Sequence, residues 1–230
     1  MALLSYEGWL FLLRWFHFLS GITWIGLLYY FNFVQTPFFG ETEPAVRSGA
    51  VQKLVPRALW WFRWGAMFTF LTGWLILLDW LGRGGLFVGS KGWTILLGGI
   101  LGTIMWANVW FVIWPKQKIV IQNAIDTAAG RPANPAAAPA GQRAGFASRT
   151  NVIFSISMLF YMGAGHITLP IPRSGTAFWI VSGIIMALIE ANALYGTQGS
   201  TKKPLATVKG TLWAGFIVAA VFYLVFEVLR

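Results

Sequence analysis

The sequence predicts an all-α, polytopic integral membrane helix bundle with about six transmembrane helices. Two observations support this fold class. Hydrophobic residues make up 57% of the 230 residues and charged residues only 10%, whereas soluble domains are about a quarter charged. Long apolar stretches also follow one another along the chain, separated by short segments rich in glycine, proline or charge. We therefore expect a single transmembrane domain over residues 1–230.

Six apolar stretches approach or exceed the roughly 20 residues that a helix needs to cross a membrane. The expected helices are 8–34, 58–81, 92–114, 149–169, 177–195 and 208–229. The first is too long for the apolar core of a signal peptide, so we expect it to be retained. Residues 116–126 can continue the third helix as an amphipathic helix. Residues 127–143, rich in alanine, proline and glycine, predict a flexible cytoplasmic loop.

The positive charges are distributed unequally between the two sides of the predicted bundle. Ten basic residues lie in the connectors after the first, third and fifth helices: Arg47, Lys53, Arg57, Lys116, Lys118, Arg131, Arg143, Lys202, Lys203 and Lys209. Only Arg83, Lys91, Arg173 and Arg230 lie on the other side. Cytoplasmic loops carry the excess of lysine and arginine. We therefore expect a bacterial inner membrane protein with both termini in the periplasm. The distribution of basic residues among the loops accounts for the net charge of +10, so we expect membrane lipid and not nucleic acid as a partner.

Several kinds of chemistry are excluded by residue types that this sequence lacks. The absence of cysteine removes disulfides, thiolate metal ligands, iron–sulfur clusters and covalently attached haem c. The sequence contains no phosphate-binding loop, no Gly-x-Ser-x-Gly elbow and no His-Glu-x-x-His zinc motif. Two histidines cannot form a three-histidine metal site. Any chemistry must therefore depend on the few polar residues inside the helices, which are costly there and need a partner or a function.

The two histidines are candidate ligands for one b-type haem. His17 shares a helix face with Arg14, Gly21 and Trp24. His166 ends a second polar stripe on the fourth helix: Asn151, Ser155, Met158, Met162 and His166. Two neutral imidazoles from facing helices can ligate haem iron, with Arg14 on a propionate or an anionic substrate and Trp24 against a ring. The alternative is that each histidine only forms a hydrogen bond to a neighbouring helix.

The fifth helix carries Glu190 and Asn192 toward its cytoplasmic end. Glu190 can relay protons or contact a polar substrate. The interpretation that we favour from the sequence is an ion pair with Arg63 or Arg149, because an unpaired buried charge is expensive.

Three stretches of the predicted helices form a recognisable set. The first helix contains Arg14-Trp15-Phe16-His17-Phe18-Leu19-Ser20-Gly21-Ile22-Thr23-Trp24-Ile25-Gly26. The third ends in Val112-Ile113-Trp114-Pro115-Lys116-Gln117-Lys118, and the fourth runs from Asn151-Val152-Ile153-Phe154-Ser155 to His166. Together these stretches resemble the membrane domain of bacterial urate oxidases that carry a cytochrome c tail. The resemblance implies a helical membrane domain that is linked to electron transfer through a periplasmic cytochrome c.

The resemblance implies a redox-linked inner-membrane protein, with a urate-oxidase-like oxidoreductase as the expected enzyme class. Because the sequence lacks a Cys-x-x-Cys-His motif, its electrons are expected to leave to a separate cytochrome c or to quinone. A different class is a non-catalytic structural or assembly subunit of a larger membrane complex. A transporter is the third alternative, although no inverted repeat or pair of broken helices is visible.

Overall fold

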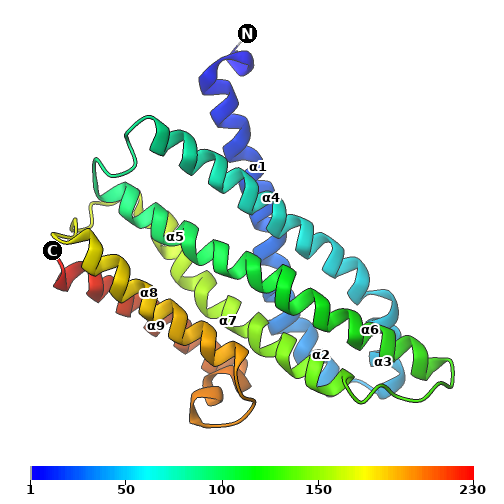
Figure 1. Cartoon of the computed structure of the whole chain (residues 1–230). Coiled ribbons are helices and arrows are strands. Elements are labelled where there is room, and N and C mark those ends of the chain that lie inside the picture. The colour runs from blue at the N-terminus through cyan, green and yellow to red at the C-terminus, as the bar shows by residue number, and fades with distance from the viewer. Residues whose placement is uncertain (1) are drawn as a thin grey trace.

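The computed structural model describes residues 2–230, which are mostly helical and contain no strand. The long helices are α1 (Tyr6–Tyr29), α4 (Val55–Gly82), α5 (Ser90–Ala107), α6 (Trp114–Ala128), α7 (Ala137–Ala164), α8 (Gly175–Leu194) and α9 (Val208–Val228). The shorter elements are η1 (Ala2–Leu4), η2 (Tyr30–Gln35), α2 (Thr36–Glu41), α3 (Pro44–Lys53), η3 (Asn108–Ile113) and η4 (Ser200–Ala206). Figure 1 shows these helices as one elongated bundle, from which the start of α1 projects.

Five helical segments are long and apolar enough to cross a membrane, which makes the chain a multi-pass membrane protein. They are Tyr6–Glu41, Val55–Gly82, Ser90–Ala128, Gly175–Leu194 and Val208–Val228. Two of these segments are continuous runs of several elements: α1, η2 and α2 form the first, and α5, η3 and α6 form the third. The amphipathic stretch expected after the third helix is therefore the helical extension α6.

Helix α7 is absent from these five segments, and it is the central helix of the bundle. Half of its 28 residues are buried, and it packs against α5, α6, α8, α9 and part of α1. Figure 1 shows α7 behind α5 and beside α8 and α9. Because neighbouring helices bury half of the α7 residues, the buried side chains can be polar if they find partners inside the protein.

The structure corrects the prediction of a flexible loop over residues 127–143, because most of this segment is helical. Helix α6 continues to Ala128, and α7 begins at Ala137, so only 129–136 lie between two helices. Alanine has the highest helix propensity of all residues, which favours an early start of α7. Pro139 is tolerated because it lies in the first turn, where backbone N–H groups have no intrahelical partner.

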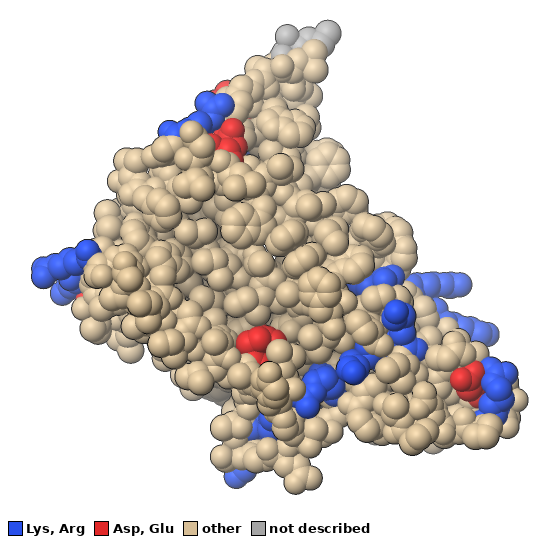
Figure 2. All heavy atoms as spheres, in the orientation of Figure 1, with Lys and Arg blue, Asp and Glu red and all other residues tan. Residues whose placement is uncertain are grey.

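Basic side chains gather at one end of the molecule. The connectors between α1 and α4, between α6 and α7, and between α8 and α9 follow alternate helices of the bundle, as the sequence analysis assumed. Figure 2 shows the blue side chains concentrated over α3, α6 and the α8–α9 connector, with fewer elsewhere on this face. At the opposite end, Tyr6 donates a hydrogen bond to Asp79, which also pairs with Arg83. Asp79 therefore joins the start of α1 to the end of α4.

Candidate functional site

A line of polar side chains runs along α7 inside the bundle. We call it the polar seam, and it comprises Ser148, Asn151 and Ser155 of α7 with their partners Tyr29, Asn32, Asn108 and Glu190. The three α7 residues share one face because they are spaced by three and four positions. Asn151 and Ser155 have no exposed surface, and Asn108 is 3% exposed. Such groups are costly inside a membrane protein unless they are hydrogen-bonded.

Asn108 lies at the junction of three helices in the polar seam. Its side-chain amide nitrogen is 2.9 Å from Asn151 Oδ1 and 2.9 Å from Glu190 Oε2. The two amide hydrogens of one asparagine suffice for both bonds. Asn151 in turn donates to the carbonyl oxygen of Met105 at 2.9 Å. This chain of hydrogen bonds connects a carboxylate on α8 to buried amides on η3 and α7.

The first membrane helix supplies the other end of the seam. Asn32 donates from its amide nitrogen to Ser148 Oγ and to the carbonyl oxygen of Leu28, both at 2.8 Å. The hydroxyl groups of Tyr29 and Ser155 lie 3.0 Å apart. The seam therefore joins side chains of η2 and the end of α1, of η3, of α7 and of α8. It is the most extensive polar arrangement that we find in the described interior.

The two asparagines that reach α7 from neighbouring helices both lie in π-helical turns. Asn32 belongs to η2 and Asn108 begins η3. Each turn ends two residues before a proline, Pro37 or Pro115, whose ring clashes with the carbonyl group four residues earlier in a regular helix. The wider turn relieves this clash and turns the asparagine toward α7. Single π-helical turns within α-helices occur frequently at functional sites.

The expected ion pair of Glu190 is contradicted by the structure. Its described partner is the amide of Asn108, and no ion pair within residues 2–230 joins Glu190 to Arg63 or Arg149. Arg63 packs over the ring of Trp114 instead. Arg149 donates to a backbone carbonyl group in η4. A neutral amide can accommodate a carboxylate by hydrogen bonding, which the charge-pairing argument from the sequence did not consider.

Basic residues near the end of α8 have a structural use. Arg143 donates to the carbonyl groups of Ala193 and Gly196, and Lys202 Nζ donates to the carbonyl group of Tyr195 at 2.8 Å. Cations at a helix C-terminus satisfy its free carbonyl groups and its dipole. Burial lowers the pKa of the Lys202 ammonium group, and the charge of Arg143 lowers it further. Asn192 similarly donates to the carbonyl group of Thr201. Its side chain therefore holds the connector between α8 and α9.

His17 is half-buried in the contact between α1 and α4. Its Nδ1 atom is 3.1 Å from the hydroxyl oxygen of Thr72, whose own hydrogen is donated to the carbonyl group of Phe68 at 2.6 Å. His17 must therefore donate from Nδ1, which leaves Nε2 as the nitrogen with a free lone pair. Gly73 leaves the space for the ring, because a Cβ there would lie 3.0 Å from His17 Cε1.

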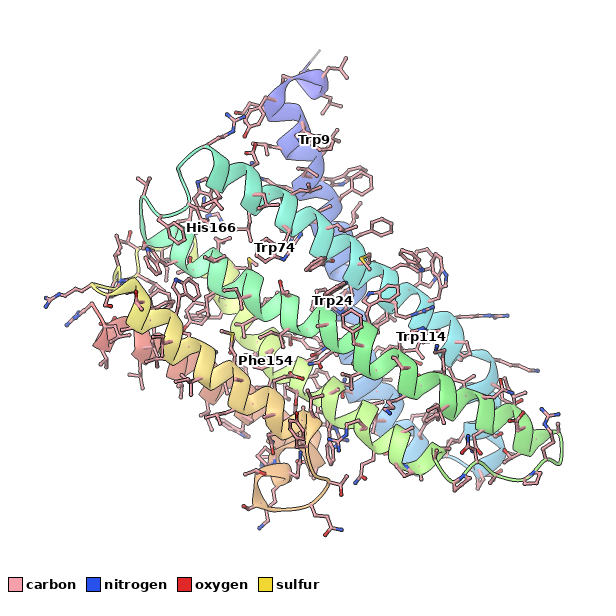
Figure 3. All side chains as sticks on the ribbon, viewed as in Figure 1. Trp9, Trp24, Trp74, Trp114, Phe154 and His166 are labelled. Carbon is pink, nitrogen blue, oxygen red and sulfur yellow. The ribbon has the colours of Figure 1, made fainter. Side chains whose placement is uncertain are left out.

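His166 lies in different surroundings, in the turn that follows α7, where its side chain is exposed. Figure 3 places it at the end of the bundle where α4 ends and α5 begins. The contacts at this end order the helices in space. Trp74 of α4 donates to Thr103 of α5 at 2.9 Å, and a Cβ on Gly165 would lie 3.0 Å from Ile95 of α5. Helices α4 and α5 therefore stand between α1, with His17, and the end of α7, with His166.

A haem that is held by both histidines of one chain does not fit this arrangement. Bis-histidine ligation requires two imidazoles on opposite sides of one iron, whereas His17 faces Thr72 on α4 and His166 is exposed beyond α7. We expect the reduced-minus-oxidised optical spectrum of the purified chain to lack a b-type α-band that depends on both residues. A band that disappears in His17→Ala and also in His166→Ala would contradict this interpretation.

The two other residues of the expected haem site, Arg14 and Trp24, differ in exposure. Arg14 is exposed on α1, and no described hydrogen bond or ion pair involves its side chain. Trp24 is 1% exposed and belongs to the hydrophobic core. Its backbone nitrogen would lie 3.1 Å from a Cβ on Gly65, which shows how closely α1 and α4 approach. Figure 3 shows Trp24 midway along the bundle.

Sequence reasoning named only part of the polar seam. The predicted stripe of the fourth helix contains Asn151 and Ser155, and Glu190 is a predicted polar residue of the fifth helix. Tyr29, Asn32 and Ser148 were missed. A usable signal exists in the sequence, because Asn32 and Asn108 each precede a proline by less than two turns near the end of an apolar run.

The fold and the seam together define a multi-pass helical membrane protein with a half-buried carboxylate that is hydrogen-bonded to a buried amide. Comparison with protein-family models gives a match to the urate oxidase N-terminal family over residues 75–225. The match covers more than half of the chain, and the chain belongs to this family. No curated protein and no solved structure matched. Asn108, Asn151 and Glu190 lie within the matched residues, whereas Arg14, His17 and Trp24 precede them.

Proposed function

We propose that this chain is the membrane-embedded component of a redox reaction of the urate oxidase type, and that the Asn108–Asn151–Glu190 part of the polar seam is its functional centre. The single observation that carries the proposal is the bond of 2.9 Å between the Asn108 amide and the Glu190 carboxylate inside the family-matched region. Ionisable groups at membrane depth are functional more often than ordinary surface charges.

The chemistry of such a reaction fits the residues of the seam. Oxidation of a heterocycle of the urate type releases protons as well as electrons, so a site for it needs a group that accepts a proton. Glu190 supplies a carboxylate, and the buried amide of Asn108, itself held by Asn151, fixes the position of that carboxylate. No residue of the cysteine-free chain attaches haem c, so we propose that the electrons pass to a separate cytochrome c or to quinone.

We further propose that the protein lies in a bacterial inner membrane with both termini in the periplasm. The concentration of basic side chains at one end of the bundle supports this orientation. The outer end would then carry Tyr6, Asp79 and Arg83, and Glu190, close to the end of α8, would lie nearer the cytoplasm.

The proposed activity can be tested on membranes from cells that express the chain. We expect urate to be consumed and added cytochrome c or a soluble quinone to be reduced in a fixed ratio, and control membranes without the chain to do neither. Consumption of urate without reduction of either acceptor would overturn the electron route. Absence of urate consumption with either acceptor would overturn the proposed reaction.

A non-catalytic subunit is the second candidate function. The start of α1 projects from the bundle in Figure 1 and presents large exposed apolar side chains together with Arg14. Such a surface suits contact with another membrane chain as well as with lipid. This role predicts that the chain co-purifies with partner chains in mild detergent and that substitutions in the seam leave the complex intact.

A further inference from the structure

Two cations approach the same indole ring near the junction of η3 and α6. The guanidinium carbon of Arg63 on α4 lies 3.4 Å from the centroid of the Trp114 ring, and Lys118 Nζ lies 5.7 Å from it. Arg63 is also 5.7 Å from the ring of Trp110 in η3. We call Arg63, Trp110, Trp114 and Lys118 the Arg63 cluster. Figure 3 shows Trp114 where α5 passes into α6.

The Arg63 cluster has no described negative charge of its own. Arg63 uses Nε to donate to the carbonyl group of Leu59 at 3.2 Å, and no described bond uses its two terminal nitrogens. The three ion pairs within residues 2–230 involve neither Arg63 nor Lys118. Two like charges beside one ring repel each other and favour an anion between them. Arg143 and Lys202 differ, because backbone carbonyl groups already satisfy them.

The residues around the Arg63 cluster are those expected at the level of the lipid headgroups. Trp60, Trp61 and Trp64 lie on the same turns of α4 as Arg63 and are 48%, 60% and 37% exposed. Tryptophan is enriched where a membrane meets water. Lys118 follows Pro115 in the amphipathic extension α6, at the end of the bundle where basic residues gather. The cations therefore lie beside lipid-facing aromatic rings on the side with the excess of positive charge.

We propose that the Arg63 cluster binds the phosphate group of an anionic phospholipid in the leaflet that faces the basic connectors. The terminal nitrogens of Arg63 donate to the phosphate oxygens, and Lys118 adds a second positive charge. The exposed tryptophans of α4 contact the acyl chains. The site does not depend on the proposed redox function.

Native mass spectrometry of the purified full chain, titrated with phosphatidylglycerol or phosphatidylcholine, tests the proposal. We expect the wild-type protein to prefer phosphatidylglycerol, and Arg63→Gln/Lys118→Gln to bind it about thirtyfold more weakly, as the loss of two surface cations implies. The matched control is Lys203→Gln/Lys209→Gln, which removes the same charge from exposed positions in and beside the α8–α9 connector. The control is expected to keep the wild-type affinity.

Three results would overturn the proposal. Equal binding of both lipids by the wild-type protein would do so without any variant, even if the double variant failed to fold. An equal loss of affinity in the control variant would show that the lipid responds to the total positive charge of this end of the protein and not to the Arg63 cluster. Displacement of phosphatidylglycerol by millimolar inorganic phosphate would show that the cluster takes a free anion and not a lipid.

Discussion

Replacing Asn151 by leucine is expected to lower the melting temperature of the detergent-solubilised protein by about 4 to 8 °C. Leucine has the same branched arrangement of side-chain heavy atoms as asparagine but no polar atom, so the change removes the hydrogen bonds of the amide. Asn108 would lose the acceptor that lies 2.9 Å from its amide nitrogen. An orphaned buried donor costs roughly 2 kcal/mol of the free energy of unfolding. A thermal shift assay measures the change.

Ser157→Ala provides the matched control for this prediction. Ser157 is also a fully buried polar residue of α7, but its hydroxyl group has no described hydrogen-bond partner. We expect its replacement by alanine to leave the melting temperature within a degree or two of wild type. If Asn151→Leu were no less stable than Ser157→Ala, the seam would not contribute to the stability of the bundle.

Replacing Gly65 by leucine is expected to separate α1 from α4 and to lower the melting temperature by about 6 to 12 °C. A Cβ at this position would lie 3.1 Å from the backbone nitrogen of Trp24 and 3.2 Å from the carbonyl oxygen of Ser20. These are backbone atoms, so a change of side-chain rotamer cannot relieve the contact. Overpacking of this kind costs about 3 kcal/mol or more. Thermal unfolding in detergent is the measurement.

Gly26→Leu makes the same substitution where α1 has free space. No atom lies within 4 Å of a Cβ built at Gly26, and leucine has the higher helix propensity. This variant is expected to be at least as stable as wild type. A comparable loss of stability in both variants would show that the effect comes from the added apolar side chain and not from the close approach of α1 and α4.

The helical membrane architecture could be predicted from the sequence because hydropathy reports directly on contact with lipid. The five apolar segments follow from it. The start of α7 could not be predicted in the same way, because this helix is surrounded by protein and its first turns are alanine-rich and only moderately apolar. The prolines and glycines of residues 127–143 favoured a loop, although Pro139 lies in the first turn of α7, where a proline costs no hydrogen bond.

The candidate site was harder to predict because its residues are distant in the sequence. Asn108 and Glu190 are 82 residues apart, and only the packing of η3 and α8 against α7 brings them together. The ion pair of Glu190 was wrong because charge balance was the only criterion that the sequence offered. The haem pair rested on two histidines whose helices were expected to face each other, and the sequence does not reveal that α4 and α5 lie between His17 and His166.

The most direct test of the central claim is the rate of urate-dependent acceptor reduction by Glu190→Gln. Glutamine keeps an oxygen that can accept from the Asn108 amide but cannot take up a proton, so we expect the variant to fold and to lose at least about a hundredfold in rate. Glu227→Gln, which changes an acid in the last turn of α9 that pairs with Arg230, is expected to keep the wild-type rate. A folded Glu190→Gln protein with the full rate would contradict the assignment of the polar seam as the functional centre.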